Sequence, residues 1–260
     1  MAAMRNVLVC SGLDPSGGAG FLLDARIIVE AGARPLGVIT AHTVQTSEGV
    51  ISAHPIDPEL LDAQLGALLG DVEVAAVKLG MLGSQQVAEV VGAALERAAG
   101  PVVWDPVLAP SRGRVAMYEG SVEAAFAALR PSLALITPNA MEAALLTGLP
   151  VTTRQEVHAA ARRLREVADC AVLIKGGHLG GDTSVDTLLP HHGEEVLELT
   201  GPRIAGGEHV HGTGCALASA IAARLACGDA LAEACASAKA LVARRLATPV
   251  RVGRGALAMG

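Results

Sequence analysis

The chain has 260 residues, of which 51% are hydrophobic and 2% aromatic, so a core must be built mainly from Ala, Val, Leu and Ile. A formal net charge of −6 with scattered arginines argues against nucleic acid as a partner. Five cysteines without metal-ligand spacing predict a reducing compartment and no disulfide framework. Because no apolar run approaches the roughly 18 residues of a membrane span, we expect a cytoplasmic protein with no membrane partner.

Short apolar runs alternate with helical patterns along the chain. We expect strands at 6–12, 35–41, 50–56, 74–80, 101–105, 133–139 and 171–177, and helices at about 18–31, 60–69, 84–99, 122–129, 140–147 and 154–167. A polar hairpin region at 184–199 precedes a helix that opens near Cys215 and a last helix at 230–246. This alternation predicts an α/β fold with a mainly parallel sheet between two layers of helices. We find no linker or repeat and expect one domain over 1–260.

Residues suited to ligand contacts gather just after the expected strands. They are Asp14 with the glycine-rich loop 17–20, Gln45, Met81, Asp105, Asn139 with Glu142, and the Lys-Gly-Gly-His segment at 175–178. Polar residues commonly end strands, so any one of these positions has a purely structural explanation. Six of them together favour a binding site, because parallel strands place ligands beyond their carboxyl ends.

The segment His-Gly-Thr-Gly-Cys at 211–215 opens an alanine-rich helical stretch. The first N–H groups of such a helix lack partners, and the helix dipole makes them an anion site, most plausibly for phosphate. The same field favours a thiolate at Cys215, which could serve as a base or nucleophile. A glycine-rich turn with a small buried cysteine is the alternative, and the segment alone does not decide between them.

Two carboxylates have both a structural and a functional interpretation. Asn139 and Glu142 lie three residues apart on one helical face, where the carboxylate could hold hydrated Mg²⁺ beside ATP phosphates. The same pair also fits a capping box, and both roles can coexist. Asp24, inside the first helix, could face the ligand cavity, although a solvated helix carboxylate is the plainer account.

The N-terminal glycine-rich loop has neither the spacing of a dinucleotide fingerprint nor that of a Walker loop. The ordered set of motifs instead resembles the hydroxymethylpyrimidine and phosphomethylpyrimidine kinases of thiamine biosynthesis, within the ribokinase-like superfamily. The resemblance is carried by residues 11–20, Asp24, 78–82, 105–107, 137–139 with Glu142, 175–178 and 211–215. Cys215 is especially telling, because most of the superfamily has Asp at the matching position. The resemblance implies a three-layer α/β/α sandwich.

The resemblance also implies roles for individual residues in an ATP-dependent phosphorylation of a hydroxymethyl group on a heteroaromatic ring. The implied pyrimidine pocket consists of Gly12, Ala19, Asp24, Gln45, Met81 and Val107. Gln45 would supply the donor and acceptor that an aminopyrimidine edge needs, and Met81 would pack on the ring. The catalytic group would be Gly212, Thr213, Gly214 and Cys215, with Cys215 as base or proton relay. Asn139, Lys175, Gly177 and Thr213 would bind ATP, and Glu142 would hold Mg²⁺ largely through water.

Three departures from the family pattern limit what can be carried over. Gln45-Thr46-Ser47 replaces the usual Gln-Asn-Thr, and His42-Thr43 replaces more apolar residues, so the pocket edge is more polar. The loop after Val107 lacks the usual lysine, leaving Arg112 or Arg114 as the cations that could bind an already phosphorylated substrate. The C-terminal glycines match the family only loosely.

The family expected from the sequence is therefore a thiamine-pathway pyrimidine kinase, and the resemblance suggests a homodimer. Two alternatives stay open. A pyridoxal or pyridoxine kinase of the related Cys-bearing group would need the same phosphate machinery with a different ring pocket. A catalytically idle protein that senses a pyrimidine or a nucleotide would also fit the departures at Thr46 and Ser111.

Overall fold

The computed structural model describes residues 4–108, 115–176 and 183–259. Nine strands form one sheet in the order β3-β2-β1-β4-β5-β6-β7-β8-β9. They are β1 (Asn6–Leu13), β2 (Arg34–Thr46), β3 (Gly49–Pro55), β4 (Ala76–Leu79), β5 (Val102–Trp104), β6 (Leu133–Ile136), β7 (Ala171–Ile174), β8 (Thr183–Leu189) and β9 (Leu197–Pro202). The run from β2 to β7 is parallel, whereas β3 pairs antiparallel with β2 and the β8–β9 hairpin antiparallel with β7. The expected mainly parallel α/β sheet is confirmed.

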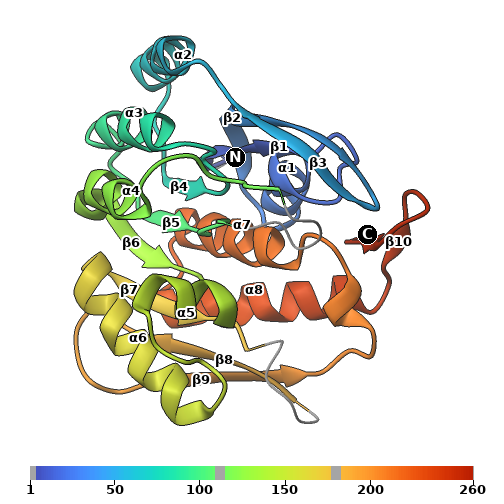
Figure 1. The fold of residues 1–260 in the computed structure, drawn as a ribbon. Coiled ribbons are helices and arrows are strands. Elements are labelled where there is room, and N and C mark those ends of the chain that lie inside the picture. Colours follow the sequence, from blue (N-terminus) through green and yellow to red (C-terminus); the bar gives the residue numbers. More distant parts are fainter. Residues whose placement is uncertain (1–3, 109–114, 177–182, 260) are drawn as a thin grey trace.

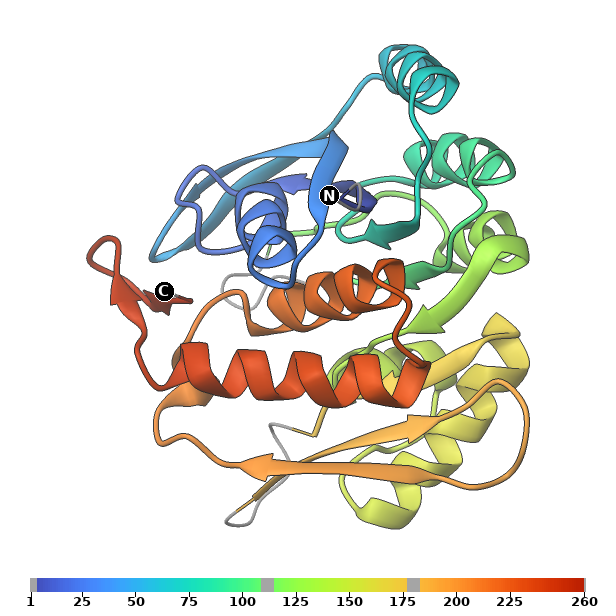
Figure 2. The same ribbon diagram turned by 180° about the vertical axis from the view of Figure 1, so that it is seen from behind.

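Helices cover both faces of this sheet, as Figures 1 and 2 show. One face carries α2 (Pro58–Asp71), α3 (Gln85–Leu95), α4 (Val122–Leu129), α5 (Ala140–Thr147) and α6 (Arg154–Ala168). The other carries α1 (Gly20–Glu30), α7 (Thr213–Ala226) and α8 (Leu231–Leu246). Alternate residues of β1 supply the two cores, since Leu8 and Cys10 belong to one and Val7 and Val9 to the other. The three layers follow from strands that are apolar on both sides.

Side-chain caps explain where several helices begin. Ser84, Asn139 and Thr153 each accept a hydrogen bond from a backbone N–H in the first turn of α3, α5 and α6. Gly148 ends α5 in the left-handed conformation that glycine adopts without strain. Most helices lie close to their expected ranges, but α3 ends at Leu95 rather than at 99.

Two features of the strands differ from the expectation. β2 continues through Thr46, so Gln45 lies within a strand and pairs with Val50 of β3 instead of following a strand in a loop. Strands β4, β6 and β7 are shorter than their apolar runs and end before Gly80, Thr137 and Lys175. The segments released in this way form the loops at the carboxyl edge of the sheet.

The C-terminal segment forms a small hairpin that the sequence did not predict. β10 (Val250–Arg251) pairs antiparallel with β11 (Leu257–Ala258), separately from the large sheet. Figure 1 shows it beside the carboxyl-terminal part of β2, and Ala258 forms a bridge with His211. Short turns of 3-10 helix occur at Arg130–Ser132 and Gly207–His209. None of the described helices is long and apolar enough to cross a membrane.

Candidate active site

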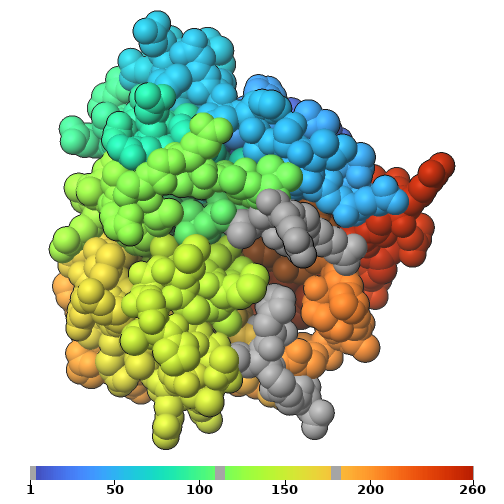
Figure 3. All heavy atoms as spheres, in the orientation of Figure 1, coloured from blue at the N-terminus to red at the C-terminus, as the bar shows by residue number. Residues whose placement is uncertain are grey.

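Two cavities lie along the carboxyl edge of the sheet, and in Figure 3 the surface is hollowed between α5 and the residues that precede α7. The smaller has a volume of about 120 Å³ and is lined by the ends of β1, β2, β4 and β5 and by the start of α7. The larger, of about 460 Å³, lies between the β8–β9 hairpin, α7 and α8. Asn139, Lys175 and Gly214 line both cavities. The geometry therefore offers two adjoining binding spaces with a cation at their junction.

Most of the residues expected to bind the ring line the smaller cavity. They are Gly12, Ala19, Gln45, Met81 and Val107. A Cβ atom at Gly12 would lie 3.1 Å from the Met81 sulfur, so the glycine brings the β1 backbone close to this side chain. Met81 is buried in a small apolar cluster with Ala41 and Met117. This cluster gives the cavity an apolar wall, and Gln45 provides a polar one.

Asp24 does not line the smaller cavity, contrary to the sequence expectation. Its side chain is fully buried, and its Oδ2 accepts hydrogen bonds from Lys78 Nζ at 2.6 Å and from the Ser11 hydroxyl at 2.7 Å. Oδ1 accepts from the hydroxyl of Ser219 at 2.7 Å. The charge of Lys78, on the central strand β4 and equally buried, requires this partner. Asp24 is therefore a structural counter-ion between α1, β4 and α7.

The start of α7 has the conformation that the glycines at 212 and 214 predict. Gly212 has φ = 91°, and a Cβ there would lie 2.1 Å from the carbonyl oxygen of Gly18, so another residue cannot fit. No side chain caps the helix, which leaves its first N–H groups open towards the cavities. Thr213 lines the larger cavity and Cys215 the smaller. A charged oxygen at the junction would meet these N–H groups and the positive end of the helix dipole.

The expectation of a thiolate at Cys215 is wrong for this structure. Burial raises the pKa of the Cys215 thiol to about 12, although the charge of Lys78 lowers it, and Asp24 and Asp105 add to the increase. The position at a helix start is therefore outweighed by removal from water and by two nearby carboxylates. At neutral pH the thiol is protonated, so it can donate a hydrogen bond or relay a proton but is a poor base.

Lys175 lies at the junction between two carboxylates, one from Asp105 directly after β5 and one from Glu142 in α5. Its Nζ is 2.6 Å from Asp105 Oδ1 and 3.9 Å from Glu142 Oε2. Although burial opposes the charge, Asp105 and Glu142 together raise the pKa of Lys175 above its usual range. A Cβ at Gly214 would lie 2.9 Å from this Nζ, so the lysine is in close contact with the start of α7. The cation is thus fixed beside the open N–H groups.

Glu142 has the capping role that the sequence allowed. Its Oε2 accepts from the Asn139 backbone N–H at 2.8 Å, and its own N–H donates to Asn139 Oδ1 at 2.9 Å. Burial raises the pKa of Glu142 to about 7, and Asp105 adds to this effect while Lys175 opposes it. The carboxylate is therefore short of positive charge, and an added cation would relieve it.

The chemistry of these donors fits Mg²⁺, which favours one or two carboxylates together with water and phosphate oxygens. The described residues contain no group of three or more His, Cys, Asp or Glu side chains that could hold a metal ion by themselves. Glu142 could contribute one carboxylate to such an ion, with water and phosphate oxygens completing its coordination, while Asp105 is paired with Lys175. Gly177, expected to contact the nucleotide, and Ser111, Arg112 and Arg114 lie outside the described residues.

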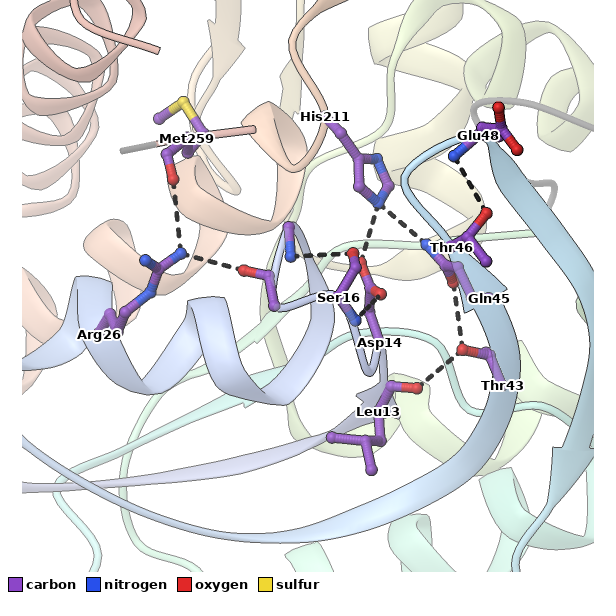
Figure 4. A network of polar contacts seen from close by, with 12 residues as sticks. Leu13, Asp14, Ser16, Arg26, Thr43, Gln45, Thr46, Glu48, His211 and Met259 are labelled. Carbon is purple, nitrogen blue, oxygen red and sulfur yellow. Dashed lines mark hydrogen bonds and ion pairs between the residues drawn. The ribbon is translucent and has the colours of Figure 1, made fainter. Parts of the chain in front are cut away.

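A polar network at the mouth of the smaller cavity was not anticipated from the sequence as a unit (Figure 4). His211 Nε2 lies 3.2 Å from Asp14 Oδ2 and 3.1 Å from Gln45 Nε2. The Thr43 hydroxyl lies 2.9 Å from the Leu13 carbonyl oxygen and 3.1 Å from Gln45 Oε1. In the sequence, Asp14 and Gln45 each follow a strand pattern, but such a pattern cannot show that β1 and β2 bring them to His211.

The sequence gave little indication of two further polar groups, the buried Lys78 and the contacts of Lys239 in the larger cavity. Lys78 interrupts the apolar run of the expected strand at 74–80, and the sequence gave no sign that its side chain is fully buried. In the larger cavity, Lys239 Nζ lies 2.8 Å from Asp186 Oδ2 and 3.2 Å from the hydroxyl of Ser184. Lys239 is more than 50 positions from Ser184 and Asp186, and none of the three belongs to a motif, so only the fold brings the lysine to the other two.

A model of the phosphomethylpyrimidine kinase family matches residues 14–260. The chain is 36% identical over 249 residues to the hydroxymethylpyrimidine/phosphomethylpyrimidine kinase of Streptomyces coelicolor, covering 96% of this chain and 91% of that protein. It is 39% identical over 253 residues to the thiamine biosynthesis bifunctional protein ThiED of Geobacter sulfurreducens, covering 96% of this chain but 51% of that protein. The structure of the pyridoxal kinase from Staphylococcus aureus in complex with AMP-PCP and pyridoxal is similar with a TM-score of 0.87 and 27% identity, covering 100% of this chain and 94% of that one. The expected ribokinase-like fold is confirmed, and the chain belongs to the phosphomethylpyrimidine kinase family.

Proposed function

We propose that this chain is an ATP-dependent kinase for the hydroxymethyl group of 4-amino-5-hydroxymethyl-2-methylpyrimidine, a step of thiamine biosynthesis, acting as one domain over its whole length. The observation that carries the proposal is the junction of two cavities at Asn139, Lys175 and Gly214. A small ring alcohol fits the smaller cavity, and a nucleotide fits the larger. Family membership supports the same assignment.

The arrangement divides the work of phosphoryl transfer among few residues. The ring would lie between Met81 and Gln45, with its hydroxymethyl group towards Cys215. Charge that develops on the transferring phosphoryl group would be stabilised by the N–H groups at the start of α7 and by Lys175. As the substrate hydroxyl oxygen forms its bond to the γ-phosphorus, the bond from that phosphorus to the β,γ-bridging oxygen would break and ADP would leave. The Cys215 thiol would take up the hydroxyl proton while it donates its own proton to an oxygen of the transferred phosphoryl group. Thr213 and Asn139 would contact the nucleotide phosphates.

We further propose that Glu142, together with Asn139, holds Mg²⁺ largely through water. When bound, the ion would supply positive charge to the phosphate oxygens. Glu142 is buried and its pKa is raised, so a bound cation would stabilise its ionised form.

A pyridoxal kinase activity is the second candidate, favoured by the similarity to the Staphylococcus aureus pyridoxal kinase. Steady-state assays with ATP and Mg²⁺ on the aminopyrimidine alcohol and on pyridoxal decide between them. We expect kcat/KM for the aminopyrimidine to be at least about tenfold higher, a difference of roughly 1.4 kcal/mol in transition-state binding. A preference for pyridoxal would overturn the proposal, and binding of either ring without turnover would indicate a sensor. The monophosphate of the aminopyrimidine alcohol is tested as a substrate in the same assay, because its turnover would show a second phosphorylation.

Two properties of the whole protein complete the proposal. Use of ATP and dependence on a reduced thiol at Cys215 are consistent with a cytoplasmic enzyme. We propose a homodimer, for which the exposed Val44 and Ile51 of the β2–β3 hairpin offer apolar surface. Light scattering during size-exclusion chromatography would test it.

A further inference from the structure

The side-chain amide of Gln45 lies between two groups that restrict which of its atoms can face them (Figure 4). On one side is the Thr43 hydroxyl, 3.1 Å from the amide oxygen and 2.9 Å from the carbonyl oxygen of Leu13. On the other side is His211 Nε2, 3.1 Å from the amide nitrogen and 3.2 Å from Asp14 Oδ2. The two amide atoms of a glutamine are assigned from such neighbours, so each neighbour can be checked as donor or acceptor.

The first check concerns Thr43. A hydroxyl has one proton to donate, and the Leu13 carbonyl oxygen can only accept. The proton of Thr43 is therefore used on Leu13, and its oxygen faces Gln45 with lone pairs. The amide atom on this side must be a donor, which means the nitrogen.

The second check concerns His211. Although burial opposes ionisation, hydrogen bonds from His211 and Ser16 lower the pKa of Asp14, so its carboxylate is an acceptor. His211 Nε2 must therefore carry a proton towards Asp14, as it does in one neutral tautomer and in the cation. The amide atom facing this N–H must accept, which means the oxygen. In Figure 4 the amide oxygen of Gln45 faces Thr43 and the amide nitrogen faces His211. Both checks require the opposite orientation, so the amide must be turned by 180°.

The ring of His211 is itself fixed in place. A Cβ at Gly18 would lie 2.9 Å from His211 Cδ2, so the backbone of the glycine-rich loop packs directly against the ring. The His211 backbone N–H donates to the carbonyl oxygen of Leu257 at 2.8 Å, and its carbonyl oxygen accepts from the Met259 N–H. The glycine-rich loop and the C-terminal hairpin therefore hold His211 in place, and this fixes the position of its Nε2–H relative to Gln45.

We propose that Thr43 and the Asp14–His211 pair are positioning residues that lock the Gln45 amide with its nitrogen towards Thr43 and its oxygen towards His211. This inference rests on the proposed function of the site and adds the basis of ring selection. The remaining N–H and lone pair of the amide can then bind an amine donor next to a ring-nitrogen acceptor. A ring with a carbonyl next to an N–H presents an acceptor and a donor in the reverse order. Its carbonyl oxygen would then face the amide oxygen, and its N–H would face the amide N–H. The lock depends on the hydroxyl of Thr43, at a position where the sequence departs from the family pattern.

The test compares two rings that lack the hydroxymethyl group, so that binding is measured without phosphoryl transfer. They are 4-amino-2,5-dimethylpyrimidine and the corresponding pyrimidin-4-one, with each Kd measured by calorimetry. We expect the parent to bind the amine at least about tenfold more tightly, because the reversed ring leaves buried polar groups unpaired. Thr43→Val, which has nearly the same shape, should reduce this preference about fivefold, corresponding to one lost hydrogen bond. Equal affinities in the parent, or an unchanged preference in Thr43→Val, would overturn the proposal.

Two matched variants separate the hydroxyl from general effects on β2. Thr43→Ser retains a hydroxyl and should retain the preference. Thr46→Val removes a hydroxyl from the same strand that accepts from the Glu48 N–H and does not line the cavity, and it should leave both affinities unchanged. A loss of preference in Thr46→Val would mean that the strand, rather than the hydroxyl of Thr43, is responsible.

The orientation can also be observed without any ring or activity. In NMR spectra of the free protein, the side-chain NH₂ protons of Gln45 should show cross-relaxation with the Thr43 methyl group and not with the His211 ring. The opposite pattern would overturn the lock. If the parent phosphorylates no ring alcohol, the proposed function fails, but this measurement still decides the orientation.

Discussion

Cys215 shows how burial can reverse an expectation drawn from sequence position. Its pKa of about 12 means that the thiol is protonated at neutral pH. We expect Cys215→Ser to remain folded and to lower kcat by roughly 10²-fold, as the loss of a positioned proton relay does. We also expect iodoacetamide at pH 7.5 to alkylate Cys215 more slowly than the exposed Cys227, because the thiolate is the reactive form.

Cys227→Ser is the matched control for this prediction, because Cys227 lies just beyond the C-terminal end of α7, with its sulfur against the carbonyl oxygen of Gly32. It should retain full turnover. Rapid alkylation of Cys215 in the free enzyme would show that a thiolate is present, and unchanged turnover in a folded Cys215→Ser would remove the residue from the mechanism.

Glu142 gives a prediction with a defined pH window. Its pKa of about 7 means that the carboxylate forms as the pH rises from 6 to 8, so Mg²⁺ should activate the parent at lower concentrations at the upper end. Glu142→Gln should need more Mg²⁺ and should lose this pH dependence. Titrations of activity against Mg²⁺ at several pH values provide the measurement. Identical titrations for both proteins would leave Glu142 with only its capping role.

The same residue can be tested without Mg²⁺ through stability. The folded state raises the pKa of Glu142, so ionisation opposes folding, and the associated stability is present at low pH and lost as the pH rises. The free energy of unfolding of the parent, relative to Glu142→Gln, should therefore fall between pH 4.5 and about 7. Denaturant titrations across this window measure the difference. A constant difference would mean that Glu142 is not desolvated.

Among the elements, the C-terminal hairpin contacts the residues beside the smaller cavity, which is the proposed ring pocket. The N–H groups of Gly255 and Ala256 donate to Ser47, in the β2–β3 turn next to Gln45, and the carbonyl oxygen of Leu257 accepts from His211. A Cβ at Gly255 would lie 2.1 Å from the Ser47 carbonyl oxygen, so Gly255→Ala must displace the hairpin. We expect a severalfold higher KM for the ring alcohol and an unchanged KM for ATP.

Gly66→Ala in α2, where a Cβ would have no neighbour within 4 Å, is the matched control and should change neither constant. Equal increases in both KM values of Gly255→Ala would show that the hairpin supports the fold as a whole rather than the ring pocket.

Most helices and strands could be predicted from the sequence, because the signals that define them lie within a few residues of each other. Apolar periodicity and capping residues such as Ser84 and Asn139 act over a few positions, so the core strands and most helix ends could be predicted. The hairpin at β10–β11 could not, because its two short strands contain no apolar run and depend on contacts with Ser47 and His211. Long-range pairing of this kind leaves no periodic signal.

At the scale of the whole molecule, the edge of the sheet that carries the site was predictable, because parallel strands bring their carboxyl ends together. The direction in which each side chain points from its helix or strand could not be predicted. Asp24 shares its helix with the cavity-lining Gly20 but points into the core, where Lys78 is buried. The larger cavity could not be inferred either, because it forms between β9 and α8, whose facing residues carry no motif.

The two-cavity arrangement makes a prediction that no single residue does, because each ligand should be separable from the other. Ala240 lines the larger cavity from α8, directly after Lys239 in the sequence, so Ala240→Trp would fill the proposed nucleotide space. We expect KM for ATP to rise about tenfold or more, equivalent to roughly 1.4 kcal/mol of lost binding, while the Kd of the free aminopyrimidine stays within a factor of two. Ser237→Trp places the same side chain on an exposed position of α8 that does not line the cavity, and it should change neither value.

Because the cavities meet only at Asn139, Lys175 and Gly214 among the described residues, a filled larger cavity should leave the ring pocket intact. Calorimetry of each ligand and steady-state kinetics on both variants make the comparison. Loss of aminopyrimidine binding in a folded Ala240→Trp would show that the two spaces form one continuous site, and unchanged kinetics would place the nucleotide elsewhere.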